Sequence, residues 1–236
     1  MCGRKTLTRD MQSIIKELAI EEWEDPDNYL PSYNIAPTQT SPVLVHAKKR
    51  KVSLMRWGLI PFWAKDKSIG SKLINARAET VNQKPSYQNL VPRRRCLVIA
   101  DGYYEWKQEG STKQPYYIQD PEGKLLLFAG LWNAWQDPNG DTIHSYTIIT
   151  TKASKSISNL HHRMPVMIAH NDINIWIQTE IYSPFESLKL INSDTVQLEA
   201  YPVSTAVNYP KNNSPELIQP LENEEPSQSD QALENQ

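Results

Sequence analysis

Short apolar segments separated by turn signals constrain the fold of this chain of 236 residues most strongly. Residues 96–100 are wholly apolar, and residues 125–135 and 145–151 flank an Asp-Pro-Asn-Gly turn signal at 137–140. Strands that follow one another at such short spacing usually pair with their neighbours in sequence. The pattern therefore predicts a sheet that is mostly antiparallel.

Other segments extend this pattern. Strands are expected at 43–47 and 52–57, joined by a basic turn at 48–51, and at 102–107 and 116–119, which pair across the polar segment 108–114. A last strand is expected at 196–203. Helical spacing of apolar residues predicts a helix over 10–18, with Asp10 as its N-cap, and a second helical region over 171–190.

Two polar stretches interrupt these elements. Residues 24–42 are rich in proline and read as loop, and residues 61–95 read as loops and short helical turns. Many strands with few helices predict an α+β fold. We expect a single domain around a curved, mostly antiparallel β-sheet or barrel with a few peripheral helices.

Composition excludes several classes of protein. The apolar fraction of 39% supports a hydrophobic core, but no run of about 18 apolar residues predicts a membrane span. We expect no signal peptide, because the start of the chain lacks an apolar segment. The only cysteines, Cys2 and Cys96, indicate a reducing compartment without a disulfide framework. No Cys/His spacing of the zinc type occurs, so no metal site is expected.

Charge is distributed unevenly along the chain. Residues 212–236 hold six acidic residues and no Lys or Arg, which leaves 25 basic and 21 acidic residues over 1–211. The last stretch is rich in Asn, Ser, Gln, Glu and Pro, a composition typical of disorder. We therefore expect a domain over 1–210 and an acidic, disordered tail over 211–236. The mildly basic domain permits an anionic partner without requiring one.

Cys2 follows the initiator methionine directly. Removal of Met1 would leave a free α-amine beside the thiol, a 1,2-aminothiol. The amine condenses with an aldehyde to a Schiff base, and the thiol then closes a five-membered thiazolidine ring. Alone, the position of Cys2 also fits an accident of sequence.

Three further clusters are polar in apolar settings. Each has a purely structural alternative: Asn75 caps a turn, Glu105 points outward from a strand, and His161 and His162 bond to nearby carbonyls. A functional interpretation joins them. Aromatic neighbours would desolvate Glu105 and raise its pKa, which suits a group that moves protons. A histidine could protonate a sugar ring oxygen, and an asparagine amide could bind a hemiacetal hydroxyl.

Seven segments in order resemble the SRAP family, the SOS-response-associated proteins that process abasic sites in DNA. The resemblance runs from residue 1 to about 210. The segments that carry it are Met1-Cys2-Gly3-Arg4, Tyr33-Asn34-Ile35-Ala36-Pro37, residues 55–63, residues 74–80, Arg95-Cys96-Leu97, Gly102-Tyr103-Tyr104-Glu105-Trp106 and residues 161–166.

The resemblance implies a mechanism. Cys2, freed of Met1, attacks the ring-opened aldehyde of an abasic site in single-stranded DNA and forms a thiazolidine crosslink that shields the lesion from strand cleavage. By the same matching, Glu105 transfers protons, Asn75 positions the abasic sugar, and His161 assists ring opening. His161 is preferred to His162 because the family motif is His, any residue, Arg. Family membership also implies removal of Met1 by the protein itself and an associated lyase activity.

The resemblance further implies DNA contacts and surroundings. Arginines contact phosphates, aromatic rings stack beside the lesion, and no base-reading element is apparent. We expect no cofactor and no metal, no membrane association, a monomer, and a location in the cytoplasm, with the nucleoid when bound to DNA. The expected DNA-binding residues are Arg4, Pro37, Trp63, Arg77, Trp106, Thr150 and Arg163.

Two other functions remain open at this point. One is an N-terminal-nucleophile amidohydrolase or peptidase in which Cys2 attacks an amide. The other is a non-covalent single-stranded DNA-binding module in which Cys2 is incidental. A denaturation-resistant adduct that forms on abasic DNA but not on intact DNA would distinguish the crosslinking mechanism from both of these alternatives.

Overall fold

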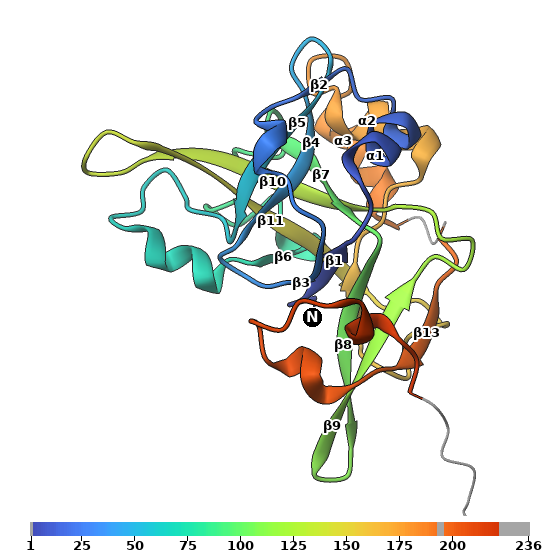
Figure 1. The fold of residues 1–236 in the computed structure, drawn as a ribbon. Coiled ribbons are helices and arrows are strands. Elements are labelled where there is room, and N and C mark those ends of the chain that lie inside the picture. Colours follow the sequence, from blue (N-terminus) through green and yellow to red (C-terminus); the bar gives the residue numbers. More distant parts are fainter. Residues whose placement is uncertain (1, 193–195, 222–236) are drawn as a thin grey trace, which may run out of the picture.

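A closed β-barrel forms the centre of the computed structural model, which describes residues 2–192 and 196–221 (Figure 1). The strands pair in the order β5–β4–β7–β10–β11, each antiparallel to the next, and β11 returns to pair with β5 in parallel. This confirms the predicted α+β fold around a barrel. The barrel strands are β4 (Thr40–His46), β5 (Arg50–Trp57), β7 (Arg95–Ala100), β10 (Leu126–Gln136) and β11 (Thr142–Lys152).

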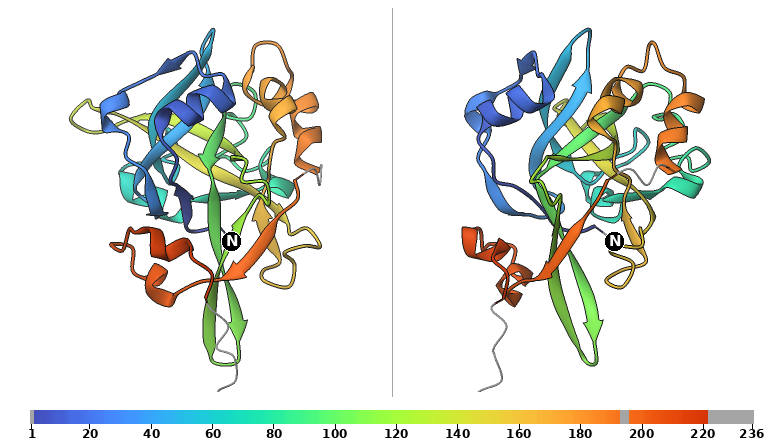
Figure 2. Two further views of the ribbon diagram at one scale, coloured as in Figure 1. Left: turned by 45° about the vertical axis from the view of Figure 1, so that its right-hand side comes forward. Right: turned by 90° about the vertical axis from the view of Figure 1, so that its right-hand side faces the viewer.

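A second, smaller sheet continues from the barrel. Its strands follow the order β13–β9–β8–β1–β3, and the β8–β9 hairpin extends away from the barrel (Figure 2). Only Asp101 separates β7 of the barrel from β8 of this sheet, so one chain segment anchors both. The strands are β1 (Lys5–Leu7), β3 (Ser32–Ile35), β8 (Gly102–Glu109), β9 (Thr112–Gln119) and β13 (Glu199–Pro202).

Shorter elements surround the sheets. Strand β2 (Glu22–Trp23) runs parallel to β5, β6 (Asn75–Arg77) runs parallel to β11, and β12 (Arg163–Pro165) is antiparallel to β11. The α-helices are α1 (Met11–Leu18), α2 (Ile173–Ile177) and α3 (Pro184–Lys189). The 3-10 helices are η1 (Pro26–Asn28), η2 (Lys67–Lys72), η3 (Ala78–Thr80), η4 (His170–Asp172), η5 (Leu190–Asn192), η6 (Thr205–Asn208) and η7 (Pro215–Ile218).

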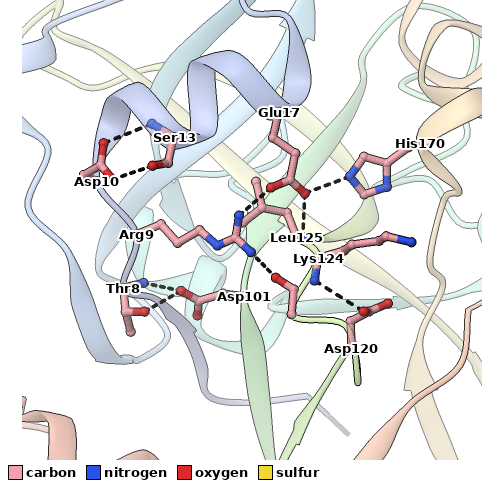
Figure 3. A network of polar contacts seen from close by, with 11 residues as sticks. Thr8, Arg9, Asp10, Ser13, Glu17, Asp101, Asp120, Lys124, Leu125 and His170 are labelled. Atoms are coloured by element: carbon pink, nitrogen blue, oxygen red, sulfur yellow. Dashed lines mark hydrogen bonds and ion pairs between the residues drawn. The ribbon is translucent and has the colours of Figure 1, made fainter.

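Helix α1 begins as the sequence predicts. The Asp10 carboxylate accepts a hydrogen bond from the Ser13 backbone N–H at 3.0 Å, which satisfies one of the first free N–H groups. Toward its C-terminal end, the Glu17 carboxylate accepts bonds from the Arg9 guanidinium and from the Leu125 N–H, and it pairs with His170 (Figure 3). Glu17 thus ties α1 to the β9–β10 loop and to η4.

Several expected boundaries differ from those in the structure. The segment 24–42, expected to be a loop, holds β3 and the start of β4, and 61–95 holds β6. The helical region 171–190 is divided in two, because Ser183 caps a new helix that starts at Pro184. The last strand is shorter than expected and covers only Glu199–Pro202. The hairpin is longer than expected, since β8 and β9 pair as far as Glu109 and Thr112.

The segment 204–221, here called the C-terminal strap, packs beside the small sheet (Figures 1 and 2). Val207 and Leu217 are buried in one cluster with Tyr104 and Tyr117. The structure therefore differs from the expected tail over residues 211–221, and the rest of that expected tail, 222–236, lies outside the described residues. No helix in the described part of the chain is long and apolar enough to span a membrane.

Candidate active site

The N-terminal segment runs along β8, which places Cys2 at the junction of the two sheets. Lys5 pairs with Tyr103 in antiparallel register, and the Tyr104 N–H donates to the Arg4 carbonyl at 3.0 Å. Continuing this register places Glu105 beside Gly3, next to Cys2. The Cys2 side chain is fully buried, and its Sγ lies 4.0 Å from the Arg4 carbonyl oxygen.

Asn75 holds Cys2 from the barrel side. Its Nδ2 donates to the Cys2 carbonyl at 2.8 Å. Strand β6 fixes the backbone of Asn75 by pairing it with Ile148 of β11. The Asn75 Oδ1 is buried and has no hydrogen-bond partner among the described residues, so an acceptor remains available at this corner.

Glu105 lies on β8 and is only 3% exposed. Burial raises its pKa above the ordinary value for a glutamate, since the charged form loses hydration. The same burial, with the nearby Glu105 carboxylate, raises the pKa of the Cys2 thiol to about 12. At neutral pH the thiol is therefore protonated, and the carboxyl beside it holds a proton more readily than usual.

The His161 ring contacts the backbone of Arg163 through Nδ1. The Arg163 N–H donates to this nitrogen at 2.9 Å, and the Arg163 carbonyl oxygen lies 3.2 Å from it. The shorter contact favours the neutral tautomer that has its proton on Nε2. Burial lowers the pKa of His161, which favours this neutral form. The His162 ring stacks on it with centroids 4.3 Å apart. When it is protonated, His161 can donate the Nε2 proton and return to the neutral ring.

Two of these side chains, Glu105 and His161, line one open cavity of about 550 Å³. They line it together with basic and aromatic side chains from the small sheet and the segment before β1, and with one amide from the strap. Cys2 lies directly behind its wall, bonded to Asn75 through the backbone. The structure therefore brings together the sequence-predicted group Cys2, Asn75, Glu105 and His161. The residues lining the cavity are Gly3, Arg4, Glu105, Trp106, Lys113, His161 and Asn208.

The predicted arginines are placed differently from one another. Arg4 lines the cavity but is only 9% exposed, and its guanidinium donates to the Asn34 Oδ1. Arg163 donates to both carboxylate oxygens of Glu79 and to the Thr150 carbonyl. Arg77 is exposed at the end of β6, two residues beyond Asn75. Of these three arginines, only Arg77 has an exposed side chain.

The remaining predicted DNA contacts also vary. Trp106 lines the cavity, and its indole N–H donates to Asn208 at 2.6 Å. Trp63 is 48% exposed and Pro37 is half-buried, but neither is among the residues that line the cavity. Thr150 is fully buried, and its hydroxyl faces the Ala76 carbonyl at 3.4 Å. In this position Thr150 supports β6 and Arg163.

Sequence reasoning missed four residues at the site. Asn34 had a signal, because it is a polar residue inside a motif that carries the family resemblance. Glu79 had a signal as a possible partner of an arginine. Lys113 and Asn208 had none, since each reaches the cavity only through the fold: Lys113 from β9 and Asn208 from the strap.

The described residues contain no group of three or more His, Cys, Asp or Glu side chains that could hold a metal ion. The groups that line the cavity are proton donors and acceptors and cations, and the buried Cys2 thiol lies next to the lining residue Gly3. Such a set can move protons and bind an anion next to a carbonyl compound.

Known proteins resemble this chain over nearly its whole length. Residues 1–210 match the family described as SOS response associated peptidase (SRAP). The chain is 41% identical over 222 residues to "Abasic site processing protein YoqW" of Bacillus subtilis (strain 168), covering 93% of this chain and 99% of the relative. It is 36% identical to "Abasic site processing protein HMCES" of Pongo abelii, covering 94% of this chain and 77% of the relative. A solved structure from Bacteroides thetaiotaomicron aligns with a TM-score of 0.81 at 25% identity, covering 93% of this chain and 99% of that chain.

Proposed function

Because the chain belongs to the SOS response associated peptidase family, we propose that it captures abasic sites in single-stranded DNA as a covalent crosslink through Cys2. Its relatives are named abasic site processing proteins, which supports a role in processing such sites. The crosslink is a thiazolidine that shields the lesion from strand cleavage. The observation that carries the proposal is the Asn75 bond to the Cys2 backbone beside the buried Glu105.

The chemistry begins once Met1 has been removed. In its protonated form, His161 donates the Nε2 proton to the ring oxygen of the abasic sugar, the anomeric hydroxyl loses its proton, and the ring opens to the aldehyde. The α-amine of Cys2 attacks the aldehyde carbon, and the resulting carbinolamine loses water to give an imine. The Cys2 thiol then adds to the imine carbon, and its proton passes to the nitrogen. Glu105 relays the protons, and Asn75 positions the sugar.

The state of the thiol supports an attack by nitrogen first. A thiol with a pKa near 12 is almost wholly protonated at neutral pH and is a poor nucleophile toward an amide. The α-amine has an ordinary pKa of about 8, so a fraction of it is already neutral. This ordering favours the aminothiol reaction over the alternative of a cysteine amidohydrolase, which needs a thiolate.

Two side activities belong to the same proposal. An imine that does not close to the ring acidifies the adjacent carbon of the sugar, and loss of that proton would expel the 3′ phosphate by β-elimination, a lyase reaction. Removal of Met1 by the protein itself would use the same proton-transfer group, Glu105, to activate water against the first peptide bond.

DNA binding in this proposal is electrostatic and sequence-independent. Arg4 and Lys113 supply positive charge at the cavity, and Trp106 offers a ring for stacking at its edge. Arg163 reaches a phosphate by exchanging it for Glu79, whose side chain is 53% exposed although that of Arg163 is 12% exposed. Arg77, Trp63 and Pro37 would contact the strand outside the cavity, and Thr150 would act through Arg163.

The test compares unchanged protein with Cys2→Ala and Cys2→Ser on abasic and intact single-stranded oligonucleotides. The unchanged protein should give a heat-stable adduct on the abasic strand only. Cys2→Ala should give none, and Cys2→Ser should give at most a labile imine, because a hydroxyl closes the ring poorly. A heat-stable adduct with Cys2→Ala would overturn the proposal. Equal reversible binding to both strands without an adduct would indicate a non-covalent DNA-binding module.

A further inference from the structure

The C-terminal strap forms part of the wall of the active-site cavity. It supplies Asn208 to the lining and continues beyond the region that matches the family, which ends at residue 210. Val203, the residue before the strap, donates its N–H to the Pro115 carbonyl, and Leu221 at the end of the strap donates its N–H to the Pro202 carbonyl. The strap is therefore fixed at both ends while its middle faces β3 and the N-terminal segment.

A single buried side chain joins this strap to β3. Asn34 is 2% exposed, and its Nδ2 lies within hydrogen-bond distance of three strap carbonyls: Val207 at 3.3 Å, Tyr209 at 3.2 Å and Asn212 at 2.8 Å. An amide nitrogen carries two protons, so these bonds are partly shared. The side-chain donor of Asn34, Nδ2, is thus directed wholly at the strap.

The other end of the Asn34 amide is directed at Arg4. The Arg4 NH1 donates to the Asn34 Oδ1 at 2.6 Å and to the Val207 carbonyl at 2.8 Å. These two acceptors fix the plane of the guanidinium while Arg4 still lines the cavity. Its Nε is buried and has no hydrogen-bond partner among the described residues. A donor on a fixed cation is therefore left for a ligand.

The chemistry of that ligand follows from charge. A guanidinium remains protonated in proteins and prefers carboxylate or phosphate oxygens. Lys113 adds a second cation to the same lining. A phosphate beside the abasic nucleotide is the anion that the proposed substrate brings to this position.

We infer that Asn34 is a positioning residue for DNA binding: it holds the Arg4 guanidinium against the strap so that Arg4 receives the phosphate next to the lesion. The identity of the ligand rests on the proposed function. The positioning itself rests on the hydrogen bonds of Asn34 and on the place of Arg4 in the cavity wall.

The test measures reversible binding of a single-stranded oligonucleotide that carries a tetrahydrofuran residue, which lacks the aldehyde and cannot crosslink. Asn34→Ala should raise the dissociation constant about tenfold, the effect of losing one hydrogen bond to a charged group. The slope of log affinity against log salt should become less steep by about 0.7, as one phosphate contact is lost. Arg4→Ala should have the same effects.

A double variant separates positioning from a general effect on the fold. If Asn34 acts through Arg4, then Asn34→Ala should add almost nothing in the Arg4→Ala background. Asn213→Ala is the matched control, because Asn213 bonds the same strap to Ser32 and Tyr33 of β3. That control should keep the affinity within about twofold. Additive losses in the double variant, or an equal loss with Asn213→Ala, would overturn the positioning role.

Arg4→Lys tests the same inference if Asn34→Ala does not fold. Lysine keeps the charge but cannot span the Asn34 Oδ1 and the Val207 carbonyl as a planar fork does. Its affinity should fall toward that of Arg4→Ala, and an affinity equal to that of the unchanged protein would overturn the inference. Failure of the unchanged protein to bind the oligonucleotide would overturn the proposed function as well, a different result from binding with additive losses.

Discussion

Single residues at this site are controlled by burial more than by charge pairing. Glu105, Cys2 and His161 all have pKa values moved by desolvation as the largest cause. Desolvation favours the neutral form of each group, so the carboxyl, the thiol and the imidazole are all less readily charged than they are in water. An aldehyde and an amine react through neutral and singly protonated species, which such a site can supply.

The sequence predicted the members of this group but not all of their environments. Aromatic neighbours in the chain indicated the burial of Glu105, and that is a local signal. The burial of Arg4 was not predictable, because its partners Asn34 and Val207 are 30 and 203 residues away. An arginine near the start of a chain is expected to be exposed, and its burial becomes visible only when the fold supplies acceptors for it.

Glu105→Gln should stabilise the protein in a pH-dependent way. The folded state raises the pKa of Glu105, so the folded protein binds its proton more tightly than the unfolded chain does. Stability of the unchanged protein therefore falls as pH rises through the interval above the ordinary value of 4.5. The glutamine variant carries no such penalty.

Thermal unfolding of both proteins from about pH 4.5 to about pH 8 measures this difference. The variant should gain in melting temperature as pH rises, while the rate of adduct formation falls. A difference in melting temperature that stays constant across this range would show that the Glu105 carboxyl titrates as it does in the unfolded chain.

Elements were predicted where the local pattern decides their structure. Helix α1, strand β7 and the β8–β9 hairpin follow from an N-cap, an apolar run and a polar turn. Strands β6 and β12 were missed, since each has three residues and exists only because β11 offers it a partner. These two strands carry Asn75 and Arg163, so the elements hardest to predict hold residues of the proposed site.

The start of β8 depends on a glycine. A Cβ at Gly102 would lie 2.2 Å from the Cζ and hydroxyl oxygen of Tyr117. That hydroxyl also lies 2.9 Å from the Thr6 Oγ1 on the neighbouring strand β1. The Tyr117 side chain cannot move away without breaking this contact to β1, and β1 directly follows the segment that holds Cys2.

Gly102→Ala should therefore destabilise the protein by at least about 2 kcal/mol, in the range of overpacked cores. Denaturant unfolding followed by tryptophan fluorescence measures the loss. Gly110→Asn is the control, because Gly110 has a positive φ of 59° with open space around it and asparagine tolerates that backbone. The control should change stability by less than about 1 kcal/mol. Equal stability of Gly102→Ala and the unchanged protein would mean that Tyr117 is not fixed as described.

The whole molecule combines a closed barrel with a smaller sheet and a strap. Closure requires the parallel pairing of β11 with β5, whose paired residues Ser145 and Arg56 are far apart in sequence. Local patterns predicted a barrel or curved sheet but could not choose the pair that closes it. The composition of residues 212–236 also concealed Leu217 and Ile218, two apolar residues that pack on the small sheet.

Affinity for single-stranded DNA should depend on salt. The proposed phosphate contacts of Arg4, Arg77 and Arg163 displace counterions from the strand. Each contact contributes about −0.7 to the slope of log affinity against log salt, which gives about −2 for three. Titrations of a tetrahydrofuran oligonucleotide at several salt concentrations measure it, and Arg77→Ala should lessen the slope by about 0.7. A slope near zero would exclude phosphate contacts as the source of affinity.

The most direct test of the proposed crosslink is the intact mass of the product formed with an abasic single-stranded oligonucleotide. The predicted mass is that of the chain without Met1 plus the oligonucleotide, less one water, with the modification located at Cys2 after digestion. Imine formation loses that water, and ring closure by the thiol changes no mass, so survival of the product on heating identifies the ring. A heat-stable product that retains Met1, or one attached at another residue, would contradict the proposal.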